Sequence, residues 1–223
     1  MAGDPLLTSR IAVMGYIEEP LKTYTEALAS GAPTPGGGSA AALVGALGAA
    51  LNSMVANFTV GREKFAAVEA DAQRLLARSE ELRRALERLT QADTEAYGGY
   101  SAASKMPRET EEQKAARTAA VQEALKAAAE VPREAARAAL DVIEVAEELV
   151  EIGNPNLITD VGCAAKFAAA ALECAALNVE INLAYIKDEP YNAGAREELA
   201  RLLDEGGKQG ERVWAKVKEK VRG

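Results

Sequence analysis

The feature that most constrains this fold is a long stretch without a charged side chain, from Ala27 to Gly61. It opens with a Gly- and Pro-rich run at 31–38, which is typical of a turn, and continues as small and apolar residues. Because a helix that is apolar on every side offers no face to water, we expect Ser39–Val60 to be a helix surrounded by protein. Its unbroken apolar part, Ala40–Leu51, is too short to span a bilayer, which takes about 20 residues.

The remaining sequence predicts further helices and no strand. Leucines spaced three, four and seven residues apart give Arg62–Ser104 the apolar stripe of an amphipathic helix. Pro132 should kink or divide the next helix, Glu111–Ile152. The other helices are expected at Met14–Ser30, Leu157–Lys187 and Asn192–Val221. With no repeat and no period-two alternation, the chain is predicted to be an all-α, up-and-down helical bundle, a single domain over residues 1–223 with a buried central helix.

Charge and composition exclude several classes of function. The 223 residues include 26 Lys and Arg and 34 Asp and Glu, which gives a formal net charge of −8, and acids and bases are mixed along every helix. A nucleic-acid-binding protein would show a basic patch, so no nucleic acid is expected as a partner. The N-terminal sequence lacks a basic segment followed by an apolar one, so we expect a cytoplasmic protein without a membrane partner. His is absent, so proton transfer would fall to Asp, Glu, Lys, Tyr or water, and no metal site is expected.

Two cysteines and two asparagines are expected in the interior. Cys163 and Cys174 lie about three turns apart on one predicted helix and should be small buried apolar side chains. Asn52 and Asn57, on the central helix, should make hydrogen bonds between helices.

Asn178 and Asn182 are candidates for ligand binding. Charged residues recur every seven positions along Leu157–Lys187 and mark its solvent face, so the two amides should point to the opposite, buried side. Buried amides need partners: the alternatives are a neighbouring helix and a heterocyclic ligand that offers donors and acceptors.

The turn Thr34-Pro35-Gly36-Gly37-Gly38-Ser39 is a second candidate site. The N–H groups of a first helical turn and the helix dipole attract anions, and glycines let a ligand approach the backbone. The alternative is a tight connection in which Ser39 is an ordinary N-cap.

Asp93 interrupts an otherwise apolar stripe. Leu82, Leu86 and Leu89 lead through position 93 to Tyr97, which places a carboxylate where an apolar residue is expected. An unpaired buried charge is costly, so Asp93 should have a partner or line a wet pocket. The alternative is a structural tie to a Tyr hydroxyl or a Lys.

Two further charged residues are candidates. Lys105 ends the face that carries Asp93 and could bind a ligand carboxylate or donate a proton, although a lysine there also compensates the helix dipole. Asp160 lies off the charged stripe of its helix and is a second carboxylate candidate, with helix capping as the alternative. About 27 Å of helix separates Asp160 from Asn178, so one small group cannot contact both.

Several motifs together resemble a known family. The segment PTPGGGSAAAL at 33–43, followed by SMVAN at 53–57, is similar to the cyclodeaminase/cyclohydrolase family of folate enzymes. The same similarity covers Asp93 with the Ala-Tyr at 96–97, the Lys-Met-Pro at 105–107, NPNL with Thr-Asp at 154–160, and NVEINL at 178–183. The family comprises the C-terminal half of formiminotransferase-cyclodeaminase and free-standing bacterial relatives, which are helical and form dimers.

This resemblance implies a function and a set of roles. The expected reaction is cyclodeamination of 5-formiminotetrahydrofolate to 5,10-methenyltetrahydrofolate and ammonia. The alternatives are a methenyltetrahydrofolate cyclohydrolase and a noncatalytic folate-binding helical protein. The expected ligand is a tetrahydrofolate derivative as substrate, with no covalently bound cofactor, and the expected partner is a second copy in a homodimer with the site at or near the interface. The candidates for catalysis are Asp93, Lys105, Tyr97 and Asp160, and those for folate binding are Thr34, Pro35, Gly36, Gly37, Gly38, Ser39, Asn178 and Asn182.

Overall fold

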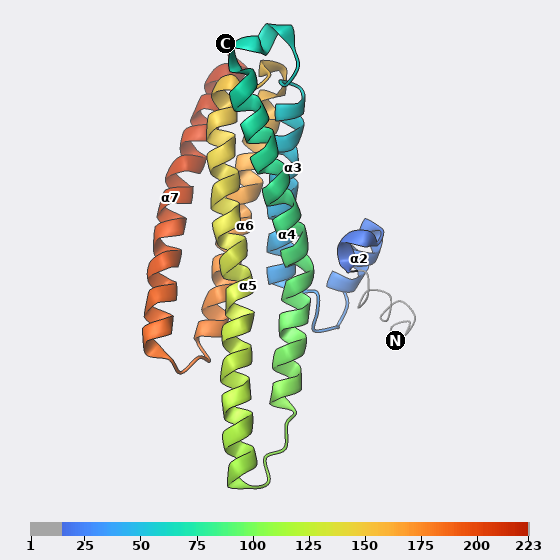
Figure 1. Ribbon diagram of the computed structural model, residues 1–223, viewed down its shortest axis with the longest axis vertical. Coiled ribbons are helices and arrows are strands. Elements are labelled where there is room, and N and C mark those ends of the chain that lie inside the picture. Colours follow the sequence, from blue (N-terminus) through green and yellow to red (C-terminus); the bar gives the residue numbers. More distant parts are fainter. Residues whose placement is uncertain (1–14, 223) are drawn as a thin grey trace.

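The computed structural model describes residues 15–222, whose regular structure is entirely helical (Figure 1). The α-helices are α2 (Leu21–Leu28), α3 (Gly37–Asn57), α4 (Glu69–Ser104), α5 (Glu111–Ile152), α6 (Ile158–Leu183) and α7 (Glu189–Arg222). Short 3-10 turns lie at η1 (Tyr16–Glu18), η2 (Glu63–Val68) and η3 (Pro155–Leu157). The predicted all-α, up-and-down bundle is confirmed.

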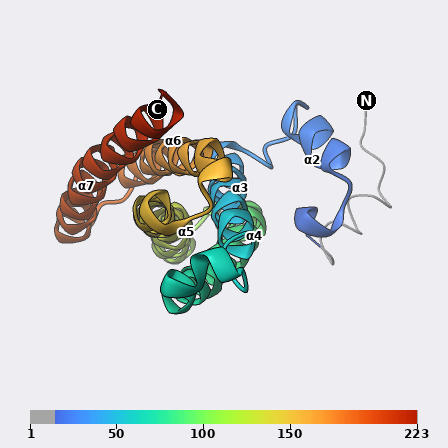
Figure 2. The ribbon, with the colours of Figure 1, turned by 90° about the horizontal axis from the view of Figure 1, so that it is seen from above.

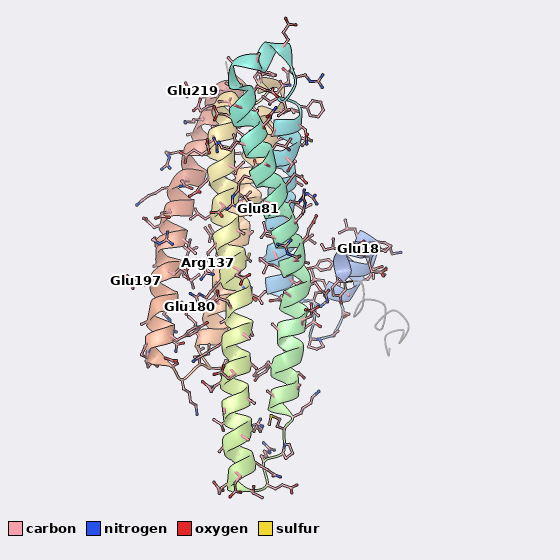
Figure 3. The ribbon with its side chains drawn as sticks, viewed as in Figure 1. Glu18, Glu81, Arg137, Glu180, Glu197 and Glu219 are labelled. Atoms are coloured by element: carbon pink, nitrogen blue, oxygen red, sulfur yellow. The ribbon has the colours of Figure 1, made fainter. Side chains whose placement is uncertain are left out.

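The core lies among the long helices. Seen from above, α3, α4, α5 and α6 are grouped around one interior, and α7 lies along the side formed by α5 and α6 (Figure 2). Small residues bring α3 close to its neighbours: a Cβ on Gly48 would lie 3.0 Å from the carbonyl oxygen of Ala164 in α6. Charged side chains stay outside, as Glu81 on α4 and Glu197 on α7 show (Figure 3).

Several helices differ from the sequence prediction. The first predicted helix is divided, because Pro20 separates η1 from α2; Met14 lies outside the described residues. The central helix begins two residues early, at Gly37, with Gly36 as its N-cap, so Ser39 is not the cap. The helix α5 is not divided by Pro132, which lies buried inside one continuous α-helix.

The expectation that α3 is surrounded by protein is wrong for one of its faces. Leu47 is 50% exposed, and beside it α6 exposes Phe167, Leu177 and Ile181. We call these four residues, with Cys174, the α3–α6 face. By length and composition α3 could also span a membrane, but 61% of its apolar window is buried in the bundle, and core helices of soluble proteins pass the same test.

The interior polar and sulfur-containing residues are only partly as expected. Asn52 is fully buried, and its Nδ2 donates to the carbonyl of Val142 in α5 at 2.9 Å, which confirms the interhelix bond. Asn57 is exposed at the end of α3. Cys163 and Cys174 are both exposed, since they lie on the side of α6 that no other described helix covers.

Candidate active site

A cavity of about 290 Å³ opens where α3 begins. Its walls come from the turn before α3 and from α4, α5 and α6, so residues from four separate parts of the chain meet there. Asp93 is the charged residue among those that line it. Aromatic rings are supplied by Tyr97, Tyr100 and Tyr185. The cavity is therefore a mixed apolar and polar space with one acidic group.

The carboxylate of Asp93 caps the N-terminus of α3. The backbone N–H of Ser39 donates to Asp93 Oδ2 at 3.0 Å. A Cβ on Gly38 would lie 2.8 Å from Cγ of Asp93, so only glycine leaves room for this carboxylate. The anion expected at this helix N-terminus is thus a side chain of the protein itself, held at the edge of the cavity.

A buried hydroxyl chain lies behind this contact. Ser39 is fully buried and its Oγ donates to the carbonyl of Thr90 at 2.8 Å. Because the single hydroxyl hydrogen of Ser39 is used there, the hydroxyl of Tyr24, 3.1 Å away, must be the donor to Ser39 Oγ. Tyr24 comes from α2, and its ring meets the ring of Tyr16 edge-on at 5.3 Å. Through Tyr24, α2 therefore contacts Ser39, whose N–H binds Asp93.

The surroundings of Asp93 shift the pKa of its carboxyl group. Burial raises the pKa of Asp93 above its usual range, and the hydrogen bond from the Ser39 N–H opposes part of that rise. A carboxyl group with a raised pKa holds its proton more tightly than a free one, which suits a group that transfers protons. This property is typical of carboxyl groups in active sites.

Two asparagines form the opposite wall. Asn178 Nδ2 donates to the carbonyl of Cys174 at 2.8 Å, and Asn182 Nδ2 donates to the carbonyl of Asn178 at 2.8 Å and approaches that of Ala128 at 3.5 Å. Both side chains are half-buried because they line the cavity, so the prediction of full burial is wrong. A Cβ on Gly37 would come within 3.3 Å of Asn178 Nδ2, so this glycine sets the width between α3 and α6.

The sequence candidates do not all meet in this cavity. Thr34, Gly36, Gly37 and Gly38 line it, with Asp93, Tyr97, Asn178 and Asn182, whereas Pro35 and Ser39 are buried next to it. Lys105 is exposed at the far end of α4, about 18 Å along the helix from Asp93. Asp160 lies in the first turn of α6, at the other end of that helix from Asn178. Long helices therefore carry Lys105 and Asp160 away from the cavity that Asp93 lines.

The comparisons with known proteins agree with this geometry. A family model described as Formiminotransferase-cyclodeaminase matches residues 20–201. The chain belongs to this family. The family resemblance predicted from the glycine motif is thereby confirmed.

Two relatives and one solved structure show how far the similarity extends. Methenyltetrahydrofolate cyclohydrolase of Methylorubrum extorquens is 46% identical over 203 residues, 91% of this chain and 98% of the relative. Formimidoyltransferase-cyclodeaminase of Sus scrofa is 35% identical over 193 residues, 86% of this chain but 36% of the relative. The crystal structure of formiminotetrahydrofolate cyclodeaminase from Thermotoga maritima matches with a TM-score of 0.77 and 34% identity, over 93% of this chain and 98% of that one.

Sequence reasoning missed several residues of this cyclodeaminase-family cavity. Tyr185, which lines the cavity, carries no local pattern that would place it there, and neither does Tyr24, which contacts Ser39 behind the cavity. The carbonyl of Ala128 did leave a signal, because Pro132, four residues later in α5, has no N–H to offer it. A proline inside a predicted helix identifies such a carbonyl in advance.

Proposed function

We propose that this chain acts on the one-carbon bridge between N5 and N10 of tetrahydrofolate, as a methenyltetrahydrofolate cyclohydrolase. The observation that carries the reaction is Asp93, an acidic group with a raised pKa in a cavity where it is the charged residue. The methenyl group is a cation, and a carboxylate beside it stabilises the charge. The match to the Methylorubrum extorquens cyclohydrolase over 98% of that protein favours this reaction.

The proposed chemistry uses Asp93 for proton transfer. Water adds to the methenyl carbon while Asp93 takes one of its protons, which gives a neutral carbinolamine. The bond from carbon to N5 then breaks as Asp93 returns the proton to N5, and the carbinol oxygen releases its own proton to solvent. The products are 10-formyltetrahydrofolate and one proton. General acid–base catalysis of this kind contributes typically about 10²–10⁴-fold.

Cyclodeamination is the second candidate, and the solved structure from Thermotoga maritima favours it. N10 would attack the formimino carbon on N5 and lose its proton to the imino nitrogen, and protonated Asp93 would supply the second proton with which ammonia leaves. The same methenyl cation results, so the same carboxylate serves both reactions. Lys105 and Asp160 have no part in either proposal because they lie away from the cavity.

The folate would lie in the cavity in one orientation. The amides Asn178 and Asn182 suit the hydrogen-bonding edge of the pterin, and the three tyrosines offer faces for aromatic rings. We further propose that the protein is cytoplasmic and that a second copy covers the α3–α6 face. That face adjoins the cavity, because Ile181 belongs to both.

One optical assay distinguishes these functions. Purified protein is mixed separately with 5,10-methenyltetrahydrofolate and with 5-formiminotetrahydrofolate, and the methenyl absorbance is followed. A cyclohydrolase lowers the absorbance in the first mixture, and a cyclodeaminase raises it in the second. If neither signal changes faster than in buffer while calorimetry shows binding, the protein is a noncatalytic folate binder and the proposed activity is wrong.

A further inference from the structure

Pro132 changes the hydrogen bonding of α5 at the wall of the cavity. In an α-helix the N–H of residue 132 would donate to the carbonyl of residue 128, and proline has no N–H. Proline is the least favourable residue in the interior of a helix, yet α5 runs through Pro132 without a break. The carbonyl oxygen of Ala128 is therefore deprived of its usual donor.

This carbonyl lies at the ligand cavity. Ala128 lines the cavity beside Leu125, and the side chain that approaches its oxygen, Asn182, lines the same cavity from α6. The contact from Asn182 Nδ2 is long, at 3.5 Å, while the same nitrogen makes a 2.8 Å bond to the carbonyl of Asn178. Asn182 thus satisfies the oxygen of Ala128 only weakly, and the oxygen retains capacity to accept from a ligand.

We propose that Pro132 is a specificity-determining residue, which exposes the Ala128 carbonyl so that it accepts a hydrogen bond from the donor edge of the substrate's heterocycle. This inference rests on the proposed folate function. A reduced pterin presents an amino group next to a ring N–H, and a backbone acceptor beside the Asn182 amide matches that edge. Pro132 does not touch the ligand; it acts through the carbonyl four residues earlier.

Replacement of Pro132 by a residue with an N–H tests this role. Pro132→Ala restores the helical bond to Ala128 O and should raise KM for 5,10-methenyltetrahydrofolate about 3- to 10-fold, with kcat unchanged, as expected for loss of one hydrogen bond. Pro132→Gly also restores the N–H, although glycine has a lower helix propensity than alanine. Because the N–H and not the propensity sets the effect, it should raise KM by the same factor. Glu134→Ala, an exposed position two residues later on α5, changes the helix without changing this carbonyl and should leave KM unaltered.

A substrate analogue makes the test specific. For the wild type, the 2-desamino-2-methyl analogue of 5,10-methenyltetrahydrofolate should have a KM about 3- to 10-fold higher than the natural substrate. For Pro132→Ala the two compounds should have equal KM values, because the acceptor of the amino group is already occupied. An unchanged KM in both variants, or an analogue penalty that persists in Pro132→Ala, would overturn the proposal. If the wild type turns over neither folate, the proposed function fails instead, and Kd for tetrahydrofolate measured by calorimetry on the same variants still tests the role of Pro132.

Discussion

The carboxyl group of Asp93 occupies the space that a side chain on Gly38 would need. Cγ of Asp93 lies 2.8 Å from where a Cβ on Gly38 would stand, and the N–H of the next residue, Ser39, holds the same carboxylate at 3.0 Å. The glycine motif and the interrupted apolar stripe, which are far apart in the sequence, are therefore two halves of one contact. Gly38 leaves the space that the carboxyl group of Asp93 occupies.

A methyl group on Gly38 should displace Asp93 from the cavity. We expect Gly38→Ala to keep the helical fold and to lower kcat at least about 100-fold, because the proton-transferring carboxyl group is moved. The matched control is Gly31→Ala, where an added Cβ meets no atom within 4 Å and the residue does not line the cavity. Far-ultraviolet circular dichroism checks the fold. Normal turnover by Gly38→Ala would show that Asp93 is not needed in its observed position.

Removal of the charge of Asp93 should lower the activity of the protein and raise its melting temperature. Since burial raises the native pKa of Asp93 above its unfolded value, the folded protein binds this proton more tightly than the unfolded chain does. Stability is therefore lost as pH rises from the unfolded pKa through the raised native pKa, and stays lower above it. Asp93→Asn should melt at a higher temperature than the wild type at about pH 8 and with a smaller difference at about pH 4. Its turnover should fall about 10²–10⁴-fold.

The converse result would identify a different role. If Asp93→Asn melts at a lower temperature than the wild type at about pH 8, the ionised carboxylate stabilises the fold. The residue is then a structural cap of α3 rather than an acid whose charged form is destabilised by burial. Calorimetric melts at several pH values distinguish these two roles. Only an acid destabilised by burial makes the excess melting temperature of Asp93→Asn over the wild type grow as the pH rises.

Local patterns predicted most of the helices and identified the glycine turn and Asp93 as separate candidates. The charge-free run identified α3, and the interruption of a leucine stripe identified Asp93, because helical periodicity fixes which residues share a face. Residue spacing did show that about 27 Å of helix separates Asp160 from Asn178, but it could not show which helix ends meet at the cavity. It also could not show that one side of α6 is uncovered, which is why Cys163 and Cys174 were expected to be buried. These depend on how helices pack, and periodicity within one helix does not contain that information.

Tyr24 should set the pH dependence of the reaction from outside the bundle. Its hydroxyl donates to Ser39 Oγ, and the Ser39 N–H lowers the pKa of Asp93. Tyr24→Phe removes the donor to Ser39 Oγ and should weaken the hydrogen bond from the Ser39 N–H to Asp93. The pKa of Asp93 then rises, and the acidic limb of the kcat profile moves to higher pH. The titratable side chains facing the cavity besides Asp93 are Tyr97, Tyr100 and Tyr185.

The matched control for this prediction is Tyr16→Phe, which removes a hydroxyl from the same segment without removing the donor to Ser39. The pKa of Asp93 can be followed directly through its ¹³Cγ chemical shift during a pH titration. We expect a higher midpoint in Tyr24→Phe and an unchanged one in Tyr16→Phe. A lower melting temperature without any change of midpoint would show that Tyr24 only anchors α2.

The α3–α6 face should be the contact between two copies of the chain. Leu177, which is 70% exposed in the single chain, would be buried there, and a charge at this position should weaken dimerisation at least about tenfold because an unpaired charge would be desolvated. Sedimentation velocity should therefore show Leu177→Arg as a monomer at concentrations where the wild type is a dimer. The control is Val221→Arg near the end of α7, which is 56% exposed and away from this face.

Cysteine labelling gives a second measurement of the same contact. Cys174 belongs to the α3–α6 face and is exposed in the single chain, so a dimer should protect it from a thiol reagent. We expect slow labelling of the wild type and labelling at least about tenfold faster in Leu177→Arg, since reaction then no longer requires dissociation. Equal labelling rates in the two proteins, together with a single monomeric boundary for the wild type, would contradict the proposed dimer. Cys174 would then be a surface thiol beside the cavity, and the apolar face would need another partner.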